Sequence, residues 1–193
     1  MHQEICSVNT EEEEWNLYFD GASNANGGGV GIVLIPPNAE VNSSMESLEL
    51  ISSHLSRNNI SLEEKLRRER CSLIPGLELN YLELSKETIS LAFKLDFPCT
   101  NNQAEYEALI LDLFTANTIG INNICIHGDS NLIMKQTNGE FALKKSMLAS
   151  YRTLVQFFWK KFQNVRYEYN PRSMNRYADA LATLASKIHI PKE

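Results

Sequence analysis

Four acidic residues stand at positions where neither a hydrophobic core nor a surface turn requires one: Asp20, Glu105, Asp129 and Asp179. Each has an ordinary explanation when taken alone, such as a helix N-terminus or a turn. A fold that gathered all four would bring like charges together, which is costly unless a cation neutralises them. Carboxylate-only ligation favours Mg²⁺ or Mn²⁺ over zinc. The four residues therefore predict a divalent-cation site.

The elements that would position these acids follow from apolar spacing. Residues 15–20 and 88–96 alternate between apolar and polar side chains, which is typical of strands, whereas residues 103–118 have the apolar spacing of a helix. We predict residues 21–29 to be a turn and Asn101 or Asn102 to cap the helix. The predicted strands are 15–20, 29–37, 88–96, 123–127 and 165–169, and the further predicted helices are 132–136, 143–162 and 175–186.

This order of elements predicts an α/β fold. Three consecutive antiparallel strands are followed by two strands that alternate with helices, which implies a five-stranded mixed sheet (three antiparallel strands, then two parallel) flanked by helices. Residues of about 39–87 do not fit this frame, because a compact domain rarely needs so long a connection. They are predicted to be an adventitious insertion or, alternatively, a regulatory or partner-binding loop. The domain spans 15–188, between an acidic tail (1–14) and a C-terminal tail (189–193).

Composition narrows the class of protein. The chain has 193 residues, of which 43% are hydrophobic and 22% charged, as expected for one globular domain. No apolar run approaches the roughly 20 residues of a membrane span, so no membrane partner is expected. The N-terminus has no signal-peptide pattern, which predicts an intracellular protein of the cytoplasm or nucleus. The four cysteines lie far apart without a C-x-x-C pair, so we predict reduced thiols and no zinc site.

Charge is unevenly distributed along the chain. The net charge of −6 argues against a nucleic-acid partner only if the chain is treated as a whole. Residues 130–193 hold 11 Lys and Arg against 4 Asp and Glu, whereas residues 1–129 hold 7 against 20. The basic half is a solvated helix face or a surface for phosphate contacts, and both readings stay open.

Four segments carry a family resemblance: YFDGAS (18–23), TNNQAEYEAL (100–109), HGDS (127–130) and NRYADALATLAS (175–186). Together they resemble a type 1 ribonuclease H, closest to the ribonuclease H domain of plant gypsy-class LTR retrotransposon polyproteins. The resemblance covers residues 15–38 and 88–188. The acidic quartet of that family matches the four acids predicted above.

The resemblance implies a ribonuclease H-like fold and hydrolysis of the RNA strand of an RNA–DNA hybrid. Two Mg²⁺ ions, or Mn²⁺ as a substitute, would be held by the four acids, one activating water and the other stabilising the leaving 3′ oxygen. Products would carry 5′-phosphate and 3′-hydroxyl ends. The residues that the resemblance places at the substrate are Asn26, Thr100, Asn101, Asn102, Ser130 and Arg172.

The chain also departs from the family pattern. A histidine that often stands ten residues before the last aspartate is here Tyr169, and a phenol is a poor proton shuttle at neutral pH. Little room is left for a basic helical protrusion, so affinity would depend on Lys144, Lys145, Lys160, Lys161 and Arg172 or on a partner domain. We expect a monomer that is a detached fragment or solo domain, with a reverse transcriptase domain in the parent polyprotein.

Three rival interpretations remain. A dinucleotide-binding fold is suggested by NGGGVG, but its glycines do not satisfy G-x-G-x-x-G and the segment leads into a strand. A catalytically weak or inactive hybrid-binding module is compatible with Tyr169 and the insertion. A translated but unfolded remnant is the third. The intact acids favour the enzyme, because a mere binder has no need for a costly carboxylate cluster.

Overall fold

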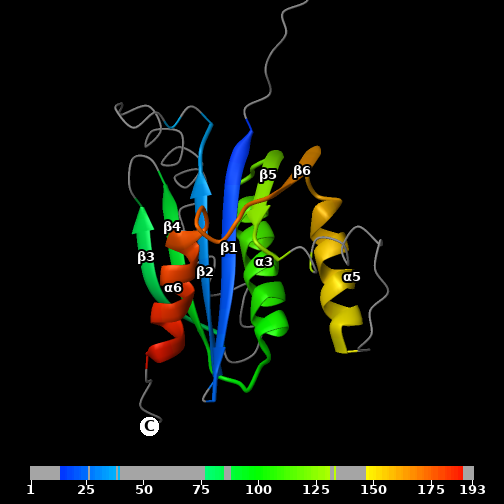
Figure 1. Ribbon diagram of the computed structural model, residues 1–193. Coiled ribbons are helices and arrows are strands. Elements are labelled where there is room, and N and C mark those ends of the chain that lie inside the picture. The colour runs from blue at the N-terminus through cyan, green and yellow to red at the C-terminus, as the bar shows by residue number, and fades with distance from the viewer. Residues whose placement is uncertain are drawn as a thin grey trace, which may run out of the picture.

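A six-stranded mixed sheet forms the centre of the molecule (Figure 1). The computed structural model describes residues 14–25, 27–37, 39, 77–84, 88–130, 133 and 147–188. The strand order is β3-β4-β2-β1-β5-β6, with β3, β4, β2 and β1 antiparallel and β1, β5 and β6 parallel. The strands are β1 (Trp15–Asn24), β2 (Gly27–Ile35), β3 (Leu77–Leu84), β4 (Ile89–Leu95), β5 (Asn123–Gly128) and β6 (Asn164–Tyr169).

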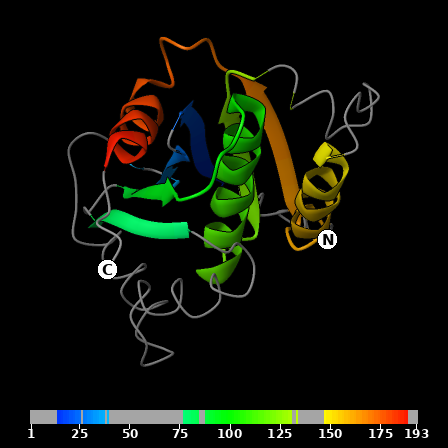
Figure 2. The same ribbon diagram turned by 90° about the horizontal axis from the view of Figure 1, so that it is seen from below.

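Helices cover both faces of this sheet (Figures 1 and 2). Helix α6 (Arg176–Lys187) packs on one face across β2, β1 and β4. Helices α3 (Asn101–Thr118) and α5 (Met147–Trp159) pack together on the other. Within the part of the chain that the structure describes, no helix has the length and apolar character of a membrane span.

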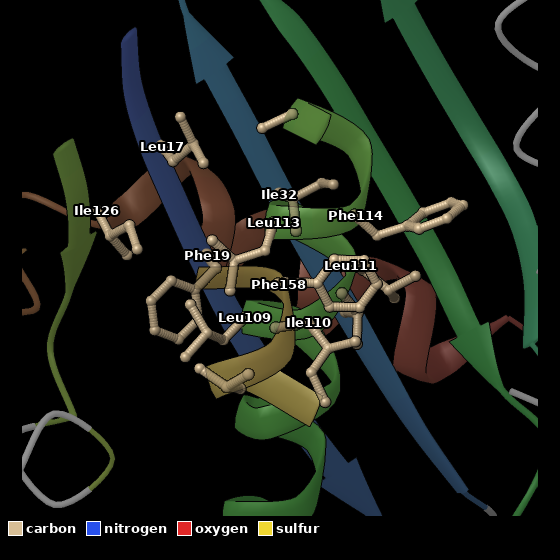
Figure 3. Close-up of a cluster of buried hydrophobic side chains, with 14 of the residues drawn as sticks. Leu17, Phe19, Ile32, Leu109, Ile110, Leu111, Leu113, Phe114, Ile126 and Phe158 are labelled. Atoms are coloured by element: carbon tan, nitrogen blue, oxygen red, sulfur yellow. The ribbon is translucent and has the colours of Figure 1, made fainter. Parts of the chain in front are cut away.

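The main hydrophobic core lies between the sheet and the α3–α5 pair (Figure 3). Alternation along β1 explains the division of the faces: Leu17 and Phe19 enter this core, while Tyr18 packs with the smaller cluster under α6. Figure 3 shows leucines of α3 converging on Phe19 and on Phe158 of α5. The apolar face predicted for α3 is confirmed, with these residues almost fully buried: Ala104, Ala108, Leu109, Leu111, Leu113 and Ala116.

The five predicted strands and their arrangement are confirmed, and a sixth strand is added. β3 comes from the segment that we had predicted to be an insertion, and it pairs with β4 at the edge of the sheet. Its sequence LELNYLEL breaks the two-residue alternation, so the pattern did not indicate a strand. A bulge between Leu79 and Tyr81 absorbs the break, so that leucines on both sides of it are register partners of apolar β4 residues.

The turn predicted over residues 21–29 is confined to the link between Asn24 and Gly27. Asn24 pairs with Gly27, so β1 and β2 form a tight hairpin and most of the glycines lie inside strands. Of the glycines in that stretch, Gly27 has a positive φ, of 136°. Gly21 and Gly29 instead allow the close approach of helices, because a Cβ atom would lie 2.2 Å from Ala104 and 2.1 Å from Ala182, which the local pattern of turn residues does not reveal.

Helix boundaries differ from the prediction by a few residues. α3 begins at Asn101 with Thr100 as its N-cap, because Thr100 and Gln103 form a reciprocal capping box. α5 ends at Trp159 rather than at 162. The predicted helix at 132–136, residues 143–146, both tails except Glu14, and most of the predicted insertion lie outside the described residues.

Candidate active site

Asp20 and Asp129 are brought together by parallel strand pairing. The last register pair between β1 and β5 joins Tyr18 to His127, and each aspartate lies two residues further along its strand direction. Asp20 is buried within β1, only 4% exposed, whereas Asp129 follows the end of β5 and is partly exposed. Two acids that lie 109 positions apart in the sequence therefore face each other at one edge of the fold.

Glu105 reaches the site because α3 packs very closely against β1. A Cβ atom on Gly21 would lie 2.2 Å from the carbonyl carbon of Ala104, so only glycine fits beside the first turn of the helix. Gly21 directly follows Asp20. This close approach places Glu105 next to the strand that carries the first acid.

Asp179 is positioned by the first turn of α6. A Cβ atom on Gly31 of β2 would lie 2.2 Å from the carbonyl oxygen of Ala178, so this helix also needs a glycine beneath it. The buried Asn175 side chain donates a 2.8 Å hydrogen bond to the carbonyl oxygen of Phe19, the residue before Asp20. Asn175 thus fixes the start of α6 to the strand that carries the first acid.

The neighbouring acids disfavour the ionised form of Asp20. Burial and the nearby Asp129 carboxylate raise the pKa of Asp20 to about 7, opposed by a 2.8 Å hydrogen bond from the Gly21 amide. The nearby Asp179 carboxyl group also raises the pKa of Asp20. The negative charges of Asp129 and Asp179 therefore disfavour the ionised form of Asp20 when no cation is bound.

The surroundings of Glu105 have opposing effects on its pKa. Burial raises the pKa of Glu105, and Asp129 adds to this effect, while a hydrogen bond from Ser130 and the charge of Arg172 lower it. Asn101 donates a 3.3 Å hydrogen bond to Glu105 Oε1. Glu105 Oε2 is buried and has no hydrogen-bond partner among the described residues. One oxygen of the site is therefore available to an incoming cation.

The residues fit a hard divalent cation. The donors are carboxylate oxygens from four different elements, which is the ligand type that Mg²⁺ and Mn²⁺ prefer. The pKa of Asp20 is raised, so its negative charge is poorly stabilised by the surrounding protein groups. The buried Oε2 atom of Glu105 has no hydrogen-bond partner among the described residues. A bound cation would favour the ionised form of Asp20 and would give the buried Glu105 oxygen a partner.

The predicted substrate residues surround this cluster to different extents. Thr100 and Asn101 are exposed and Asn102 is half-buried at the start of α3. The Arg172 side chain is 73% exposed, with Nε 3.7 Å from Asp129 Oδ2. Ser130 accepts a 3.4 Å hydrogen bond from the Ile133 amide in addition to its bond with Glu105. Asn26, Lys144 and Lys145 lie outside the described residues.

Lys160 and Lys161 lie far from the acids. They occupy the turn before β6, whereas the site is at the other end of that strand, beyond Tyr169. A six-residue strand spans roughly 20 Å. A phosphate bound beside Arg172 would therefore lie out of reach of these lysines.

Sequence reasoning missed three residues of the site. Asn175 was assigned only to the start of a helix, and Gly21 only to a turn. Tyr167 was assigned only to a strand, yet its buried hydroxyl has no partner among the described residues, and the neighbouring Asp129 and Glu105 add to burial in raising its pKa. Alternation along β6 could have placed Tyr167 on the α3 side of the sheet, but not beside the acids.

The sheet order, the flanking helices and the acid cluster define a ribonuclease H-like domain. The chain belongs to the family described as reverse transcriptase-like, which its residues 88–185 match. The predicted ribonuclease H-like fold is confirmed by solved structures. The ribonuclease H1 of Halobacterium salinarum superposes with a TM-score of 0.53 at 26% identity, over 89% of this chain and 96% of that one.

Further relatives support the same class. The ribonuclease HI of H. salinarum is 38% identical over 86 residues, which is 45% of this chain and 43% of that protein. A bifunctional protein of Mycobacterium tuberculosis is 36% identical over 83 residues, which is 43% of this chain and 23% of that protein. This chain therefore spans less than half the length of both. LC11 ribonuclease H1, solved with an RNA/DNA hybrid, shares the fold at 20% identity and a TM-score of 0.51, over 89% of this chain and 95% of that one.

Proposed function

We propose that this domain hydrolyses the RNA strand of RNA–DNA hybrids in a reaction that requires divalent cations. The observation that carries the proposal is the coupled group of Asp20, Glu105, Asp129 and Asp179, delivered by four separate elements. Burial and the neighbouring Asp129 and Asp179 raise the pKa of Asp20 to about 7, and perturbed pKa values of this kind concentrate at functional sites. The relatives that are named ribonuclease H support the same activity.

The four acids would hold two Mg²⁺ ions, with Mn²⁺ as a substitute. Bound cations of this kind neutralise charge on a scissile phosphate and make water a stronger nucleophile at neutral pH. The chain's own contribution is to fix the carboxylates: Asn175 and Gly21 hold their elements, and Ser130 and Asn101 orient Glu105. The products would carry 5′-phosphate and 3′-hydroxyl ends.

The substrate would be recognised mainly through its backbone. Asn101 and Asn102 offer amide groups beside Glu105, where contacts to 2′-hydroxyls distinguish RNA from DNA. Arg172 offers an exposed cation beside Asp129, and Thr100 and Ser130 offer hydroxyl groups. Phosphate and sugar contacts carry little sequence information, so cleavage should show low sequence preference. A relative of the same fold was solved with an RNA/DNA hybrid, which supports this substrate class.

A second candidate function is hybrid binding with little or no catalysis. The observation that favours it is Tyr169, which replaces an imidazole with a phenol at the end of β6. The cation site would persist in such a protein, but proton transfer or product release would be slow.

The direct test is cleavage of a labelled RNA–DNA hybrid by the purified chain with Mg²⁺, Mn²⁺ or EDTA. We expect metal-dependent cleavage of the RNA strand, abolished by Asp129→Asn. The matched control is Asp96→Asn, which alters an exposed acid after β4 and should leave the rate unchanged. A folded protein that binds hybrid without cleaving it would establish the second candidate, and one that does neither would contradict both.

We further propose that the domain derives from a plant gypsy-class LTR retrotransposon polyprotein, in which a reverse transcriptase domain is its partner. The four motif segments and the match to the reverse transcriptase-like family support this origin. The chain would act as a monomer inside the cell, in the cytoplasm or the nucleus. Gel filtration of the purified chain tests the oligomeric state.

A further inference from the structure

A second group of ligating side chains lies on β5 and β6. Cys125 and His127 are two residues apart on β5 and therefore on the same face, and Glu168 is the register partner of His127 on β6. One ligand atom from each of the three residues lies within 4.8 Å of the others. We propose that Cys125, His127 and Glu168 form a binding site for a zinc-class divalent cation, separate from the four carboxylates.

The His127 ring is already oriented as a ligand. Its Nε2 lies 2.8 Å from Asn16 Oδ1, which can only accept, so Nε2 carries the ring proton. Its Nδ1 lies 3.1 Å from the amide nitrogen of Asn170, which can only donate, so Nδ1 carries a lone pair that accepts this hydrogen bond and that a bound cation would take over. Two independent amides therefore agree on one tautomer. The Tyr18 ring stacks on the imidazole at 4.5 Å and holds its plane.

Glu168 offers its remaining oxygen to the same point. Arg166 binds Glu168 Oε1, while Oε2 lies 3.6 Å from His127 Nδ1. In the tautomer above, both atoms are acceptors, so a cation between them would replace a repulsive contact. The charge of Arg166 is itself compensated by two contacts with Glu14, of 3.3 Å and 2.6 Å. Arg166 therefore orients the carboxylate without excluding a cation.

The separation of the His127 and Glu168 ligand atoms matches a tetrahedral ion, and a small shift of Cys125 within the 4.8 Å limit of the cluster would complete the site. Zinc binds nitrogen and oxygen at about 2.1 Å and sulfur at about 2.3 Å, which places neighbouring ligand atoms roughly 3.4–3.7 Å apart. The separation of Nδ1 and Oε2 is already 3.6 Å. Mixed thiolate, imidazole and carboxylate ligation selects zinc-class ions over Mg²⁺. Burial raises the pKa of Cys125 to about 11, so the thiol keeps its proton until a cation displaces it.

A cation can reach this cluster from solvent, and its binding would link β5 to β6. Cys125 and His127 are buried, but the Glu168 side chain is 44% exposed and opens the cluster toward solvent. Water can supply the fourth ligand. An ion here would fasten β6 to β5 just before Asp129. The spacing of cysteines could not indicate this site, because its third ligand lies 41 residues beyond His127.

Zn²⁺ titration of the reduced protein against a chromophoric chelator, with excess Mg²⁺ to occupy the carboxylate site, tests the proposal. We expect one Zn²⁺ per chain and a higher melting temperature on binding. Co²⁺ in place of Zn²⁺ should give a thiolate-to-cobalt charge-transfer band. Cys125→Ser should abolish that band and weaken binding by more than the roughly 10- to 100-fold that loss of a supporting partner costs.

Cys99→Ser is the matched control, because Cys99 is a free thiol outside the cluster. It should bind Zn²⁺ as the unaltered chain does. Equal binding by the Cys125→Ser and Cys99→Ser variants, or the absence of the thiolate band in the folded unaltered protein, would overturn the proposal. If Cys125→Ser does not fold, Glu168→Gln decides: weakened binding supports the site and unchanged binding refutes it.

Discussion

Asp112 is a fully buried acid that the proposed chemistry does not use. It lies within α3 with no exposed surface, and neither carboxyl oxygen has a hydrogen-bond partner among the described residues. Burial raises the pKa of Asp112 well above its ordinary value. Protonation of Asp112 in the folded state therefore stabilises the protein. This contribution is fully present below the pKa of aspartate in the unfolded chain, about 3.9, and it is lost as the pH rises through the higher pKa of Asp112 in the folded state.

We predict that Asp112→Ala raises the free energy of unfolding at pH 8 by about 1–3 kcal/mol, because the cost of an unsatisfied buried carboxyl disappears. The gain should shrink as pH falls toward 4. Urea denaturation from pH 4 to 8 in the presence of EDTA measures it. Asp96→Ala, which alters an exposed acid, should follow the curve of the unaltered protein. A loss of stability at pH 8 would contradict the prediction.

Tyr169 occupies the position where an imidazole would assist the reaction. Its ring is 56% exposed, and its register partner is Gly128, the residue before Asp129. We predict that Tyr169→His raises kcat for hybrid cleavage by roughly tenfold or more, because an imidazole can transfer protons near neutral pH. Steady-state kinetics with a labelled hybrid measures the effect. Tyr169→Phe is the control, and no gain with histidine would refute the role assigned to this position.

At the level of elements, glycines decide how closely the helices approach the strands that carry the acids. We predict that Gly21→Ala leaves a folded protein that is destabilised by about 1–3 kcal/mol, because the new methyl group forces α3 away from β1. Glu105 then moves away from Asp20, so Mn²⁺ affinity should fall at least about tenfold. Calorimetric titration with Mn²⁺ and a thermal melt measure both. Ser23→Ala on the same strand is the control, and unchanged Mn²⁺ affinity in the Gly21 variant would contradict this account.

For the whole molecule, the location of charge matters more than its sum. The net charge is −6, yet the exposed Arg172 lies beside the acids, whereas Lys161 lies at the opposite end of β6. We predict that hybrid affinity falls steeply with salt and that Arg172→Ala lowers the salt slope by about one. Lys161→Ala should leave the slope unchanged. Fluorescence anisotropy with a labelled hybrid over a salt series measures the slope for both variants. Equal slopes for Arg172→Ala and Lys161→Ala would show that affinity does not depend on charge near the site.

The sequence by itself determined the five predicted strands and the buried face of α3, and it indicated the four acids as a candidate site. These features are local, because strand alternation, helical spacing and an acid beside an apolar run are all read from near neighbours along the chain. Leu17, Phe19 and the α3 leucines lie where that periodicity predicted.

Only the tertiary structure decided how distant segments meet. The bulge in β3 lets leucines on both of its sides pair with apolar β4 residues, and Gly21 and Gly29 serve helix packing rather than a turn. The proximity of Asp129 and Asp179 to Asp20, and the meeting of Cys125 and His127 with Glu168, depend on which strands and helices lie side by side. Such contacts depend on sheet register and on burial, and neither quantity is a property of residues that are neighbours in the sequence.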